Sequence, residues 1–349
     1  MIIQIKSLLI LFLFKCYSFF KLTYFINLIE YLGGPLFVKI FQSFNNFNNL
    51  QVKDDMNGTI GIIEKDKNII RKSLHNNIKS NMEESFTILK YILKLNNTLF
   101  PFNFDDYYKI NLEQLDLNKE REYSLILKDM FKNIENVNII NIYFSTKEYH
   151  LSYFIDAYPI NVFLDYNPEY RTDIINLLYL SYYLMLSNNI FHCDWHFGNF
   201  LVKLDSNSKI ILYILDTGLM GKLDNSQHSK LKILLTTNML VLEPINLVKF
   251  LSFVNSNKEA NIKKFIKDTK EIYNFRENNI SYKNTIIKII KNASKYNLKF
   301  PIVILYMFQV IIFLNNLVND NLKGENNYNK LLIFSKKYGF YNEIQKTLN

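Results

Sequence analysis

Ten consecutive residues near the middle of the chain constrain its fold more than any other feature. They have the sequence FHCDWHFGNF (191–200), and an Asp-Thr-Gly turn begins seventeen residues after Asn199. Asp194, Asn199 and Asp216 are each flanked by apolar sequence typical of a short strand or helix. Phosphoryl transfer from a metal-bound nucleotide needs this arrangement: an Asp, an Asn five residues later, and an Asp-x-Gly after an apolar hairpin.

Each of these three residues suits a separate chemical role. Asp194 can accept a proton from the attacking group or orient that group. The Asn199 amide oxygen and the Asp216 carboxylate are hard oxygen ligands for a Mg²⁺ ion that bridges nucleotide phosphates. Strands predicted at 200–202 and 210–215 would hold both ligands on a rigid hairpin. A structural His and Asp beside an ordinary hairpin would explain any one residue alone, but the set predicts a kinase-type site for ATP and Mg²⁺.

Composition limits the class of protein and the kind of partner. The chain has 349 residues, of which 49% are hydrophobic and 21% charged, so it is long and apolar enough for a globular fold with two lobes. The formal net charge is +9, but the basic residues are scattered and only four are Arg, which favours a solvated surface over a nucleic-acid groove. Cys16 and Cys193 lie far apart, so we expect no disulfide framework and a reducing compartment.

The order of predicted elements indicates an α+β fold with a small strand-rich N-lobe and a larger helical C-lobe. Strands are predicted at 59–63, 68–73, 137–143 and 149–155, and helices at 76–96 and 112–131. Beyond residue 167, nearly everything except the 200–216 hairpin is predicted to be helical. The predicted domains are an N-terminal helical extension at 1–50, an N-lobe at 51–156 and a C-lobe at 157–349.

Two apolar segments raise the question of membrane contact. The run 8–14 lies between Lys6 and Lys15, and no acidic residue precedes Glu30. It is far shorter than the ~20 residues of a membrane-spanning helix, so membrane-surface association and a helix docked on the fold both stay open. The second segment, 301–318, is interrupted by polar residues and is predicted to be a buried C-lobe helix.

A kinase-type site also needs N-lobe groups that bind the phosphates. Gly58 and Gly61 lie in the segment NGTIG (57–61), which can form a phosphate-binding turn, although an ordinary hairpin turn fits it equally well. Lys72 follows an apolar run in the second predicted strand, and Glu120 lies on a later helix where its carboxylate can pair with Lys72. Taken alone, both residues would be ordinary surface charges.

The catalytic segment carries a family resemblance. HCDWHFGN (192–199), followed by LDTG (215–218), resembles the H-x-D-x-H-x-G-N loop and the metal-binding turn of the UbiB-like (ADCK-type) atypical kinases. GPLFVKIFQ (34–42) is similar to the G-P-x-F-x-K-x-G-Q signature of that family's N-terminal extension. There the resemblance implies that Lys39 and Gln42 enter the active site.

The same family carries an E-x-D-x-x-x-E helix motif, to which residues 114–120 are similar. This similarity makes Glu120 the expected partner of Lys72. Apart from the resemblance, His192 is expected to support the catalytic loop and His196 to orient it. The resemblance further implies a protein kinase-like fold that uses ATP and Mg²⁺, and a link to isoprenoid-quinone or lipid metabolism at membranes. Protein-kinase activity is not expected, because the family's extension would occlude a peptide site.

Four departures make the chain a divergent member of such a family. Phe41 replaces a Gly of the extension signature, and residues 55–58 replace an Ala-rich nucleotide loop. Gln114 replaces the first Glu of the helix motif, which removes the charge expected to face Lys39. Thr217 replaces the Phe of an Asp-Phe-Gly turn while the metal carboxylate is kept.

Three functions therefore stay open. The first is a UbiB-like kinase or ATPase. The second is a small-molecule phosphotransferase of the aminoglycoside or choline kinase type, which predicts an acidic acceptor pocket in the C-lobe and no ordered role for Lys39. The third is a pseudokinase scaffold that binds nucleotide or lipid, which the departures favour and the retained Lys72 and Asp194 oppose. A metal hydrolase based on His192 and His196 has too few ligands.

Overall fold

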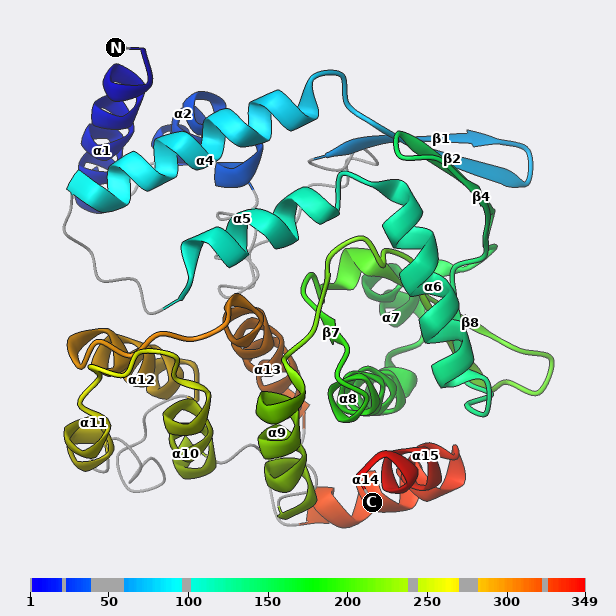
Figure 1. Cartoon of the computed structure of the whole chain (residues 1–349). Coiled ribbons are helices and arrows are strands. Elements are labelled where there is room, and N and C mark those ends of the chain that lie inside the picture. The colour runs from blue at the N-terminus through cyan, green and yellow to red at the C-terminus, as the bar shows by residue number, and fades with distance from the viewer. Residues whose placement is uncertain are drawn as a thin grey trace. The chain divides into compact units, whose positions relative to one another are not determined.

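The computed structural model describes the backbone of residues 2–20, 23–38, 60–95, 102–237, 244–269, 282–321 and 326–348. The chain forms two compact units, shown with their elements in Figure 1. The smaller unit comprises Met1–Phe100, Asn111–Arg121 and Ile142–Phe154, and the larger one comprises Pro101–Ile110, Glu122–Asn141 and Ile155–Asn349. The smaller unit is rich in strands and the larger is mainly helical, so the predicted α+β class is confirmed. The predicted domain boundaries stay a prediction.

The smaller unit contains a four-stranded antiparallel sheet in the order β1-β2-β5-β4. Its strands are β1 (Gly61–Asp66), β2 (Ile69–Leu74), β4 (Ile142–Ser145) and β5 (Tyr149–Tyr153). The strands predicted at 59–63 and 68–73 leave residues 64–67 for the turn between them, but β1 pairs with β2 as far as Asp66. The turn consists only of Lys67 and Asn68, and Lys67 adopts a left-handed φ of 52° that lets two residues reverse the chain.

Three helices of the smaller unit pack together: α1 (Ile2–Phe20), α2 (Thr23–Gly33) and α4 (Ile78–Leu95). Their shared core contains Ile10, Leu13, Ile29, Phe37, Ile88 and Ile92. An ion pair of 2.6 Å between Lys6 Nζ and Glu84 Oε1 also joins α1 to α4. The N-terminal helix thus docks on the fold, as one of the two alternatives predicted. Its other face carries Ile2, Ile5 and Phe12 at 67%, 58% and 61% exposure.

A glycine of the extension-like segment has a structural role. Gly34 follows α2 with φ at +77°, a conformation that ends helices and favours glycine, and its N–H donates to Glu30 O at 2.8 Å. A Cβ at Gly34 would lie 2.5 Å from Ser85 Oγ of α4, so glycine also permits the close approach of these segments.

Two segments predicted as single elements are each divided in the structure. The helix predicted at 112–131 is two helices, α5 (Phe104–Glu113) and α6 (Leu117–Phe131). The break is stabilised by Asp116, whose carboxylate accepts the Asn118 N–H at 3.1 Å. The strand predicted at 137–143 divides into β3 (Val137–Ile139) and β4, which belong to different sheets.

The larger unit contains a second sheet in the order β3-β9-β8-β6. β8 (Phe200–Leu204) and β9 (Ile210–Ile214) form the hairpin predicted from the sequence, β3 lies parallel to β9, and β6 (Tyr158–Pro159) pairs with β8. β7 (Phe191–His192) and β10 (Met220–Gly221) form a separate antiparallel pair. This hairpin and this pair place the catalytic-type segment on anchored backbone.

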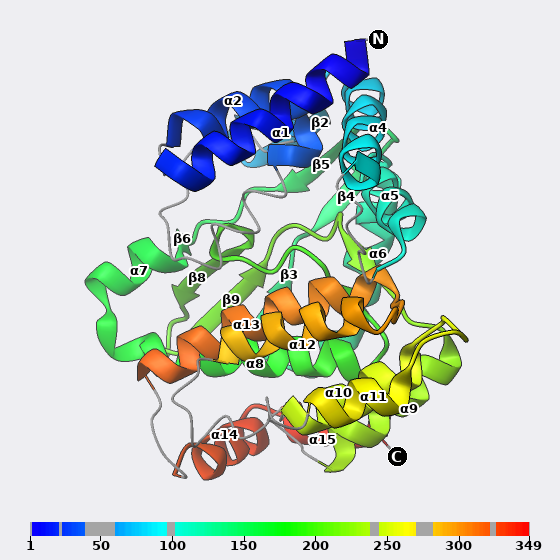
Figure 2. The same cartoon turned by 90° about the vertical axis from the view of Figure 1, so that its left-hand side faces the viewer.

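Most helices of the larger unit lie to one side of this sheet, below it in Figure 2. The α-helices that follow β6 are α7 (Ile160–Tyr166), α8 (Arg171–Ser187), α9 (Asn225–Thr237), α10 (Pro244–Val254), α11 (Ile262–Thr269), α12 (Tyr282–Lys295), α13 (Ile302–Asn321), α14 (Asn326–Lys337) and α15 (Phe340–Leu348). Helix α8 is buried on nearly all sides and packs against β9 and α13. The predicted buried C-lobe helix is confirmed as α13, in which Ile304 and Met307 have no exposed surface.

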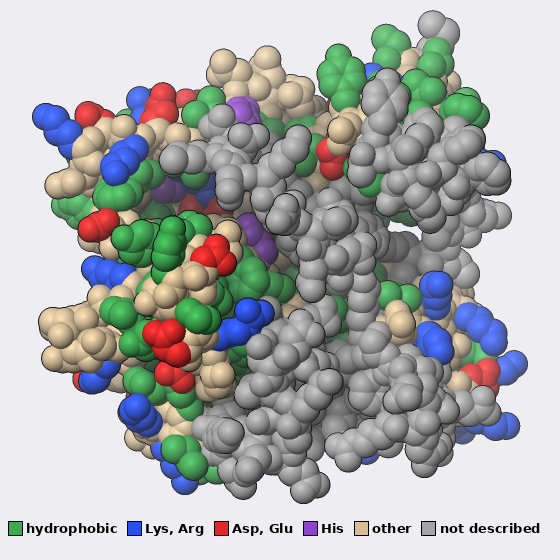
Figure 3. All heavy atoms as spheres, turned by 180° about the vertical axis from the view of Figure 1, so that it is seen from behind, with side chains coloured by type: hydrophobic (Ala, Val, Ile, Leu, Met, Phe, Trp, Pro, Cys, Tyr) green, Lys and Arg blue, Asp and Glu red, His purple; other side chains and the backbone are tan. Residues whose placement is uncertain are grey.

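Charged side chains of both signs are interspersed over the described part of the face in Figure 3. Helix α11 exposes the cationic side chains Lys263, Lys264 and Lys267. Among the helices that the structure describes, none is long and apolar enough to cross a membrane.

Candidate active site

The catalytic-type loop of the larger unit is fixed at both ends. At its start, β7 pairs with β10, and the Cys193 N–H donates to Leu219 O at 2.9 Å. At its end, residues Phe197–Asn199 form a single 3₁₀ turn that leads into β8. His196 caps this turn, since its Nδ1 accepts the Gly198 N–H at 3.1 Å. Asp194 is therefore presented on a short segment between two anchored ends.

His192 connects the catalytic-type loop to the Asp-Thr-Gly turn. Its Nδ1 accepts the Asp194 N–H at 3.2 Å, and its Nε2 donates to the Asp216 backbone carbonyl at 2.6 Å. This pattern requires the neutral ring with its proton on Nε2. Burial lowers the pKa of His192, since desolvation disfavours the imidazolium. His192 thus supports the catalytic-type loop by bonding it to the Asp216 backbone.

The two candidate metal ligands, Asn199 and Asp216, are each held by local hydrogen bonds. Asn199 Nδ2 donates to Asp194 O at 2.7 Å, which directs the amide nitrogen into the loop and leaves Oδ1 on the other side of the amide group. The Leu215 N–H donates to Asn199 O at 3.0 Å, one residue before Asp216. Asp216 Oδ1 accepts the Gly218 N–H at 2.8 Å. The hairpin therefore fixes the backbone of both predicted ligands.

This donor set fits a magnesium ion bound together with a nucleotide. An amide oxygen and a carboxylate are oxygen ligands of the kind that Mg²⁺ prefers, and the phosphates complete such a site. Among the described residues, no group of three or more His, Cys, Asp or Glu side chains is placed to hold a metal ion by itself. Asn199 and Asp216 offer two oxygen ligands, and a bound nucleotide would supply others.

Asp194 and His196 lie at the accessible side of the loop. The Asp194 side chain is 38% exposed and that of His196 is 25% exposed. His196 Nε2 lies 3.6 Å from Asp194 Oδ1, a distance at which the ring can orient the carboxylate. Asp194 is thus placed where an acceptor group can reach it, as a catalytic base requires.

An aromatic cluster lies behind the loop. Trp195, the only tryptophan of the chain, packs against Tyr182, His192 and Phe200 at ring-centroid distances of 5.3, 5.1 and 4.7 Å. Cys193 is buried beside this cluster, and burial raises the pKa of its thiol. These contacts indicate that the cluster packs behind the loop and supports it. The raised pKa makes the Cys193 thiol a poor nucleophile.

The predicted ion pair is present in the smaller unit. Lys72 Nζ lies 3.0 and 2.9 Å from the two carboxylate oxygens of Glu120. The side chains are only 11% and 2% exposed, so the pair is largely removed from water. The site role of both residues stays a prediction, but the structure brings the lysine and the carboxylate together as expected.

The remaining predicted binding residues are placed differently. Gly61 is the first residue of β1 and pairs with Leu74, where a Cβ would lie 2.7 Å from the Ser73 carbonyl oxygen. Its glycine therefore permits close strand pairing and does not form a turn. Gly58, Lys39 and Gln42 lie outside the described residues.

The structure gives a reason for Gln114. The side chain is 2% exposed, and its Nε2 donates to Asn111 O at 2.9 Å and to Asn111 Oδ1 at 3.1 Å. A glutamate here would place a carboxylate against two acceptors and could make neither bond. The amide is thus required by its local partners, a reason that the sequence motif did not reveal.

One residue near the ion pair was missed by sequence reasoning. His150 on β5 lies opposite Lys72 on β2, and its Nε2 is 3.4 Å from Glu120 Oε1. No spacing motif marks His150, because the contact depends on strand register.

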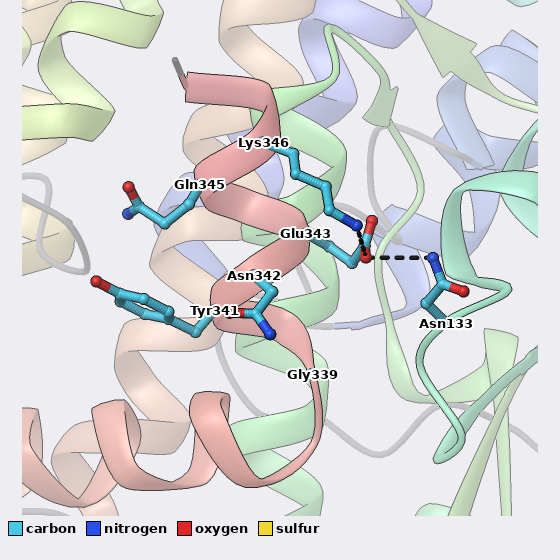
Figure 4. Close-up of a pocket in the computed structure, with 7 residues that line it drawn as sticks. All are labelled: Asn133, Gly339, Tyr341, Asn342, Glu343, Gln345 and Lys346. Atoms are coloured by element: carbon cyan, nitrogen blue, oxygen red, sulfur yellow. Dashed lines mark hydrogen bonds and ion pairs between the residues drawn. The ribbon is translucent and has the colours of Figure 1, made fainter.

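The structure also has an open depression of about 480 Å³ in the larger unit, shown in Figure 4. It is lined by Asn133, Gly339, Tyr341, Asn342, Glu343, Gln345 and Lys346. Glu343 Oε1 already binds Lys346 Nζ at 2.7 Å and Asn133 Nδ2 at 3.2 Å. None of the predicted site residues lines this depression, so we do not assign the chemistry to it.

The strand-rich unit contains a buried Lys–Glu pair, and the helical unit contains an Asp–Asn–Asp hairpin site. These features define a protein of the kinase-like class. The model of the ABC1 atypical kinase-like domain matches residues 61–242, more than half of the chain. The chain therefore belongs to this family, which is the ABC1/UbiB-like family indicated by the sequence motifs.

The other comparisons add little. No curated protein matches the chain. A solved structure of an Rv3197–erythromycin complex from Mycobacterium tuberculosis is 12% identical to the chain, with a TM-score of 0.43. That similarity covers 77% of this chain and 76% of the other.

Proposed function

We propose that this chain is a divergent ABC1-family phosphotransferase or ATPase that binds ATP with Mg²⁺. The observation that carries the proposal is the bonded network of the larger unit, in which His192 and Asn199 connect the Asp194 loop to the Asp216 turn. Such preorganisation is what phosphoryl transfer asks of a protein, because its catalysis depends on positioning and electrostatic stabilisation.

In the larger unit, Asn199 Oδ1 and the Asp216 carboxylate would hold Mg²⁺. When bound, the metal ion neutralises charge that develops on the phosphates. The attacking oxygen forms a bond to the γ-phosphorus, the bond from that phosphorus to the ADP oxygen breaks, and Asp194 accepts the proton that the attacking group loses. The 38% exposure of the Asp194 side chain supports this role.

In the smaller unit, the Lys72 ammonium would bind phosphate oxygens while Glu120 fixes its direction. A buried lysine held by two bonds of 2.9–3.0 Å has few rotamers left to lose when phosphate binds, which favours affinity. The predicted roles of Gly58, Lys39 and Gln42 in nucleotide binding remain proposals that the described residues do not address.

The acceptor is proposed only as a class. The family resemblance supports a lipid or isoprenoid-quinone related molecule, or water in an ATPase, over a protein substrate.

A nucleotide-binding scaffold is the second candidate function, and one observation favours it. Gln114 stands where the family motif has a Glu, and its bonds to Asn111 leave no place for that charge.

Asp194→Asn tests the catalytic proposal and separates it from the scaffold. We expect this variant to retain MgATP binding and to lose ATP turnover by a factor of about 10² to 10⁴, the usual contribution of a general base. Asp165→Asn is the matched control, because Asp165 is an exposed aspartate on α7 of the same unit. Equal turnover by wild type and Asp194→Asn would remove Asp194 from the mechanism.

A further inference from the structure

His150 is an unusual residue for the interior of the smaller unit. It is 1% exposed, and neither ring nitrogen has a hydrogen-bond partner among the described residues. A buried polar group without a partner lowers stability, so such groups are rare and call for an explanation.

The explanation begins with the strand register. His150 of β5 lies directly opposite Lys72 of β2, so both side chains are on the same face of the sheet. On that face, Glu120 of α6 approaches both residues. Its Oε1 lies 3.0 Å from Lys72 Nζ and 3.4 Å from His150 Nε2. The second separation is close enough for an ion pair, but its geometry is not that of a hydrogen bond.

Among the described residues, the charged side chains that strand register and ion-pair distance place against His150 are Lys72 from β2 and Glu120 from α6. The neighbour from β4 is the uncharged Ser145. While His150 is neutral, Glu120 Oε1 is bonded to Lys72 and not to the ring. A protonated His150 would be a further cation beside the same carboxylate, and Glu120 would have to divide its bonds between the ring and Lys72.

We propose that His150 is a positioning residue for Lys72, and that its protonation draws Glu120 Oε1 away from the lysine and weakens nucleotide binding. The inference rests on the proposed role of Lys72 in binding ATP. The neutral ring leaves the Lys72–Glu120 pair intact, whereas the imidazolium donates Nε2–H to Glu120 and loosens the lysine. Nucleotide affinity is therefore lower when His150 is protonated than when its ring is neutral.

The contact itself can be tested without nucleotide. The ring resonances of His150 are identified by their loss in His150→Gln and followed by NMR across about pH 5 to 8, the range of imidazole titration. In Glu120→Gln, the midpoint of the His150 titration should move to lower pH, because the carboxylate that favours the imidazolium is gone. An unchanged midpoint would show that His150 does not sense Glu120, and would overturn the proposal.

The consequence for binding uses the full chain and MgATP. Between about pH 7.5 and 5.5, the Kd of the wild type should rise about tenfold more than that of His150→Gln, which corresponds to ~1.4 kcal/mol of coupling. The comparison removes the titration of ATP itself, since both proteins bind the same ligand. His75→Gln is the control, because it removes the other histidine of the smaller unit, and it should follow the wild type.

The outcomes separate this inference from the proposed function. Identical pH dependence in wild type and His150→Gln would overturn the role of His150 even if MgATP binds. If MgATP does not bind at any pH, the proposed function fails, and the NMR titration alone decides whether His150 is coupled to Glu120. His150→Phe provides a second neutral variant if His150→Gln does not fold.

Discussion

Replacing His192 with Phe tests whether this ring holds the candidate site together. The ring is 1% exposed, so water cannot take its place. The change removes the bond from Nε2 to Asp216 O at 2.6 Å and the bond from the Asp194 N–H to Nδ1 at 3.2 Å. Phe keeps a flat aromatic ring beside Trp195, whose centroid lies 5.1 Å away, although this ring is larger than imidazole. The variant therefore removes both hydrogen bonds while an aromatic ring stays in the cluster.

The expected loss follows from these two bonds. A hydrogen bond contributes about 0.5–1.5 kcal/mol net, and a buried group left without a partner costs about 1–3 kcal/mol. Because the Asp194 and Asp216 backbone groups are partly buried, we expect His192→Phe to lower the free energy of unfolding by about 2–4 kcal/mol in total. MgATP turnover should fall as well, since the loop and the metal turn lose their connection.

Urea unfolding measures this loss by two signals. Far-UV circular dichroism follows the whole chain, and the fluorescence of Trp195, its only tryptophan, reports on the site. Tyr182→Phe is the matched control, because it alters the same aromatic cluster but removes a hydroxyl that has no hydrogen-bond partner among the described residues. It should change stability by less than about 0.5 kcal/mol. The reasoning is refuted if His192→Phe is as stable as wild type, or if both variants lose the same amount.

Three further predictions concern other parts of the chain. Lys72→Met should lower the free energy of unfolding by about 3–5 kcal/mol, because the Glu120 carboxylate stays buried without the lysine. Adding Glu120→Gln should recover part of this loss. The prediction is contradicted if, in urea unfolding, the double variant loses the sum of the two single losses. Burial lowers the pKa of His228, so the unfolded chain binds more protons than the folded chain and stability should fall as pH drops below about 6.5. In His228→Gln, the free energy of unfolding should fall less steeply with pH. Equal pH dependence of this free energy in wild type and variant would argue against the prediction. The exposed face of α1 is expected to carry the wild type onto anionic lipid vesicles, and Phe12→Glu on that face should abolish this co-sedimentation without loss of helicity. Undiminished co-sedimentation of the variant would exclude this face as the membrane contact.

The parts of the site that local sequence determines were predictable. The 191–200 segment and the following hairpin form as expected, because alternating apolar residues and a polar turn specify a hairpin over a short stretch of chain. The Lys72–Glu120 pair was also predicted, since a family motif indicated a contact between residues 48 positions apart. Whether these residues act as proposed stays a prediction.

Other features depend on contacts that a single sequence does not display. The proximity of His150 to Glu120 follows from the register of β2 and β5, which no spacing pattern encodes. The structural bonds of Gln114 depend on the turn that follows α5, which brings its side chain to Asn111. The division of the strand predicted at 137–143 into β3 and β4 was not predicted, because an apolar run does not show where the chain passes from one sheet to another.

The most direct test of the central claim is the affinity of the purified protein for MgATP, measured by titration calorimetry on wild type, Asp216→Asn and Asp165→Asn. Asp216→Asn removes the only carboxylate among the two proposed metal ligands, so we expect binding to be lost there and kept in the Asp165→Asn control. Equal MgATP affinity in wild type and Asp216→Asn, or no binding by a well-folded wild type, would contradict the assignment of Asp216 and Asn199 as a nucleotide-bound magnesium site.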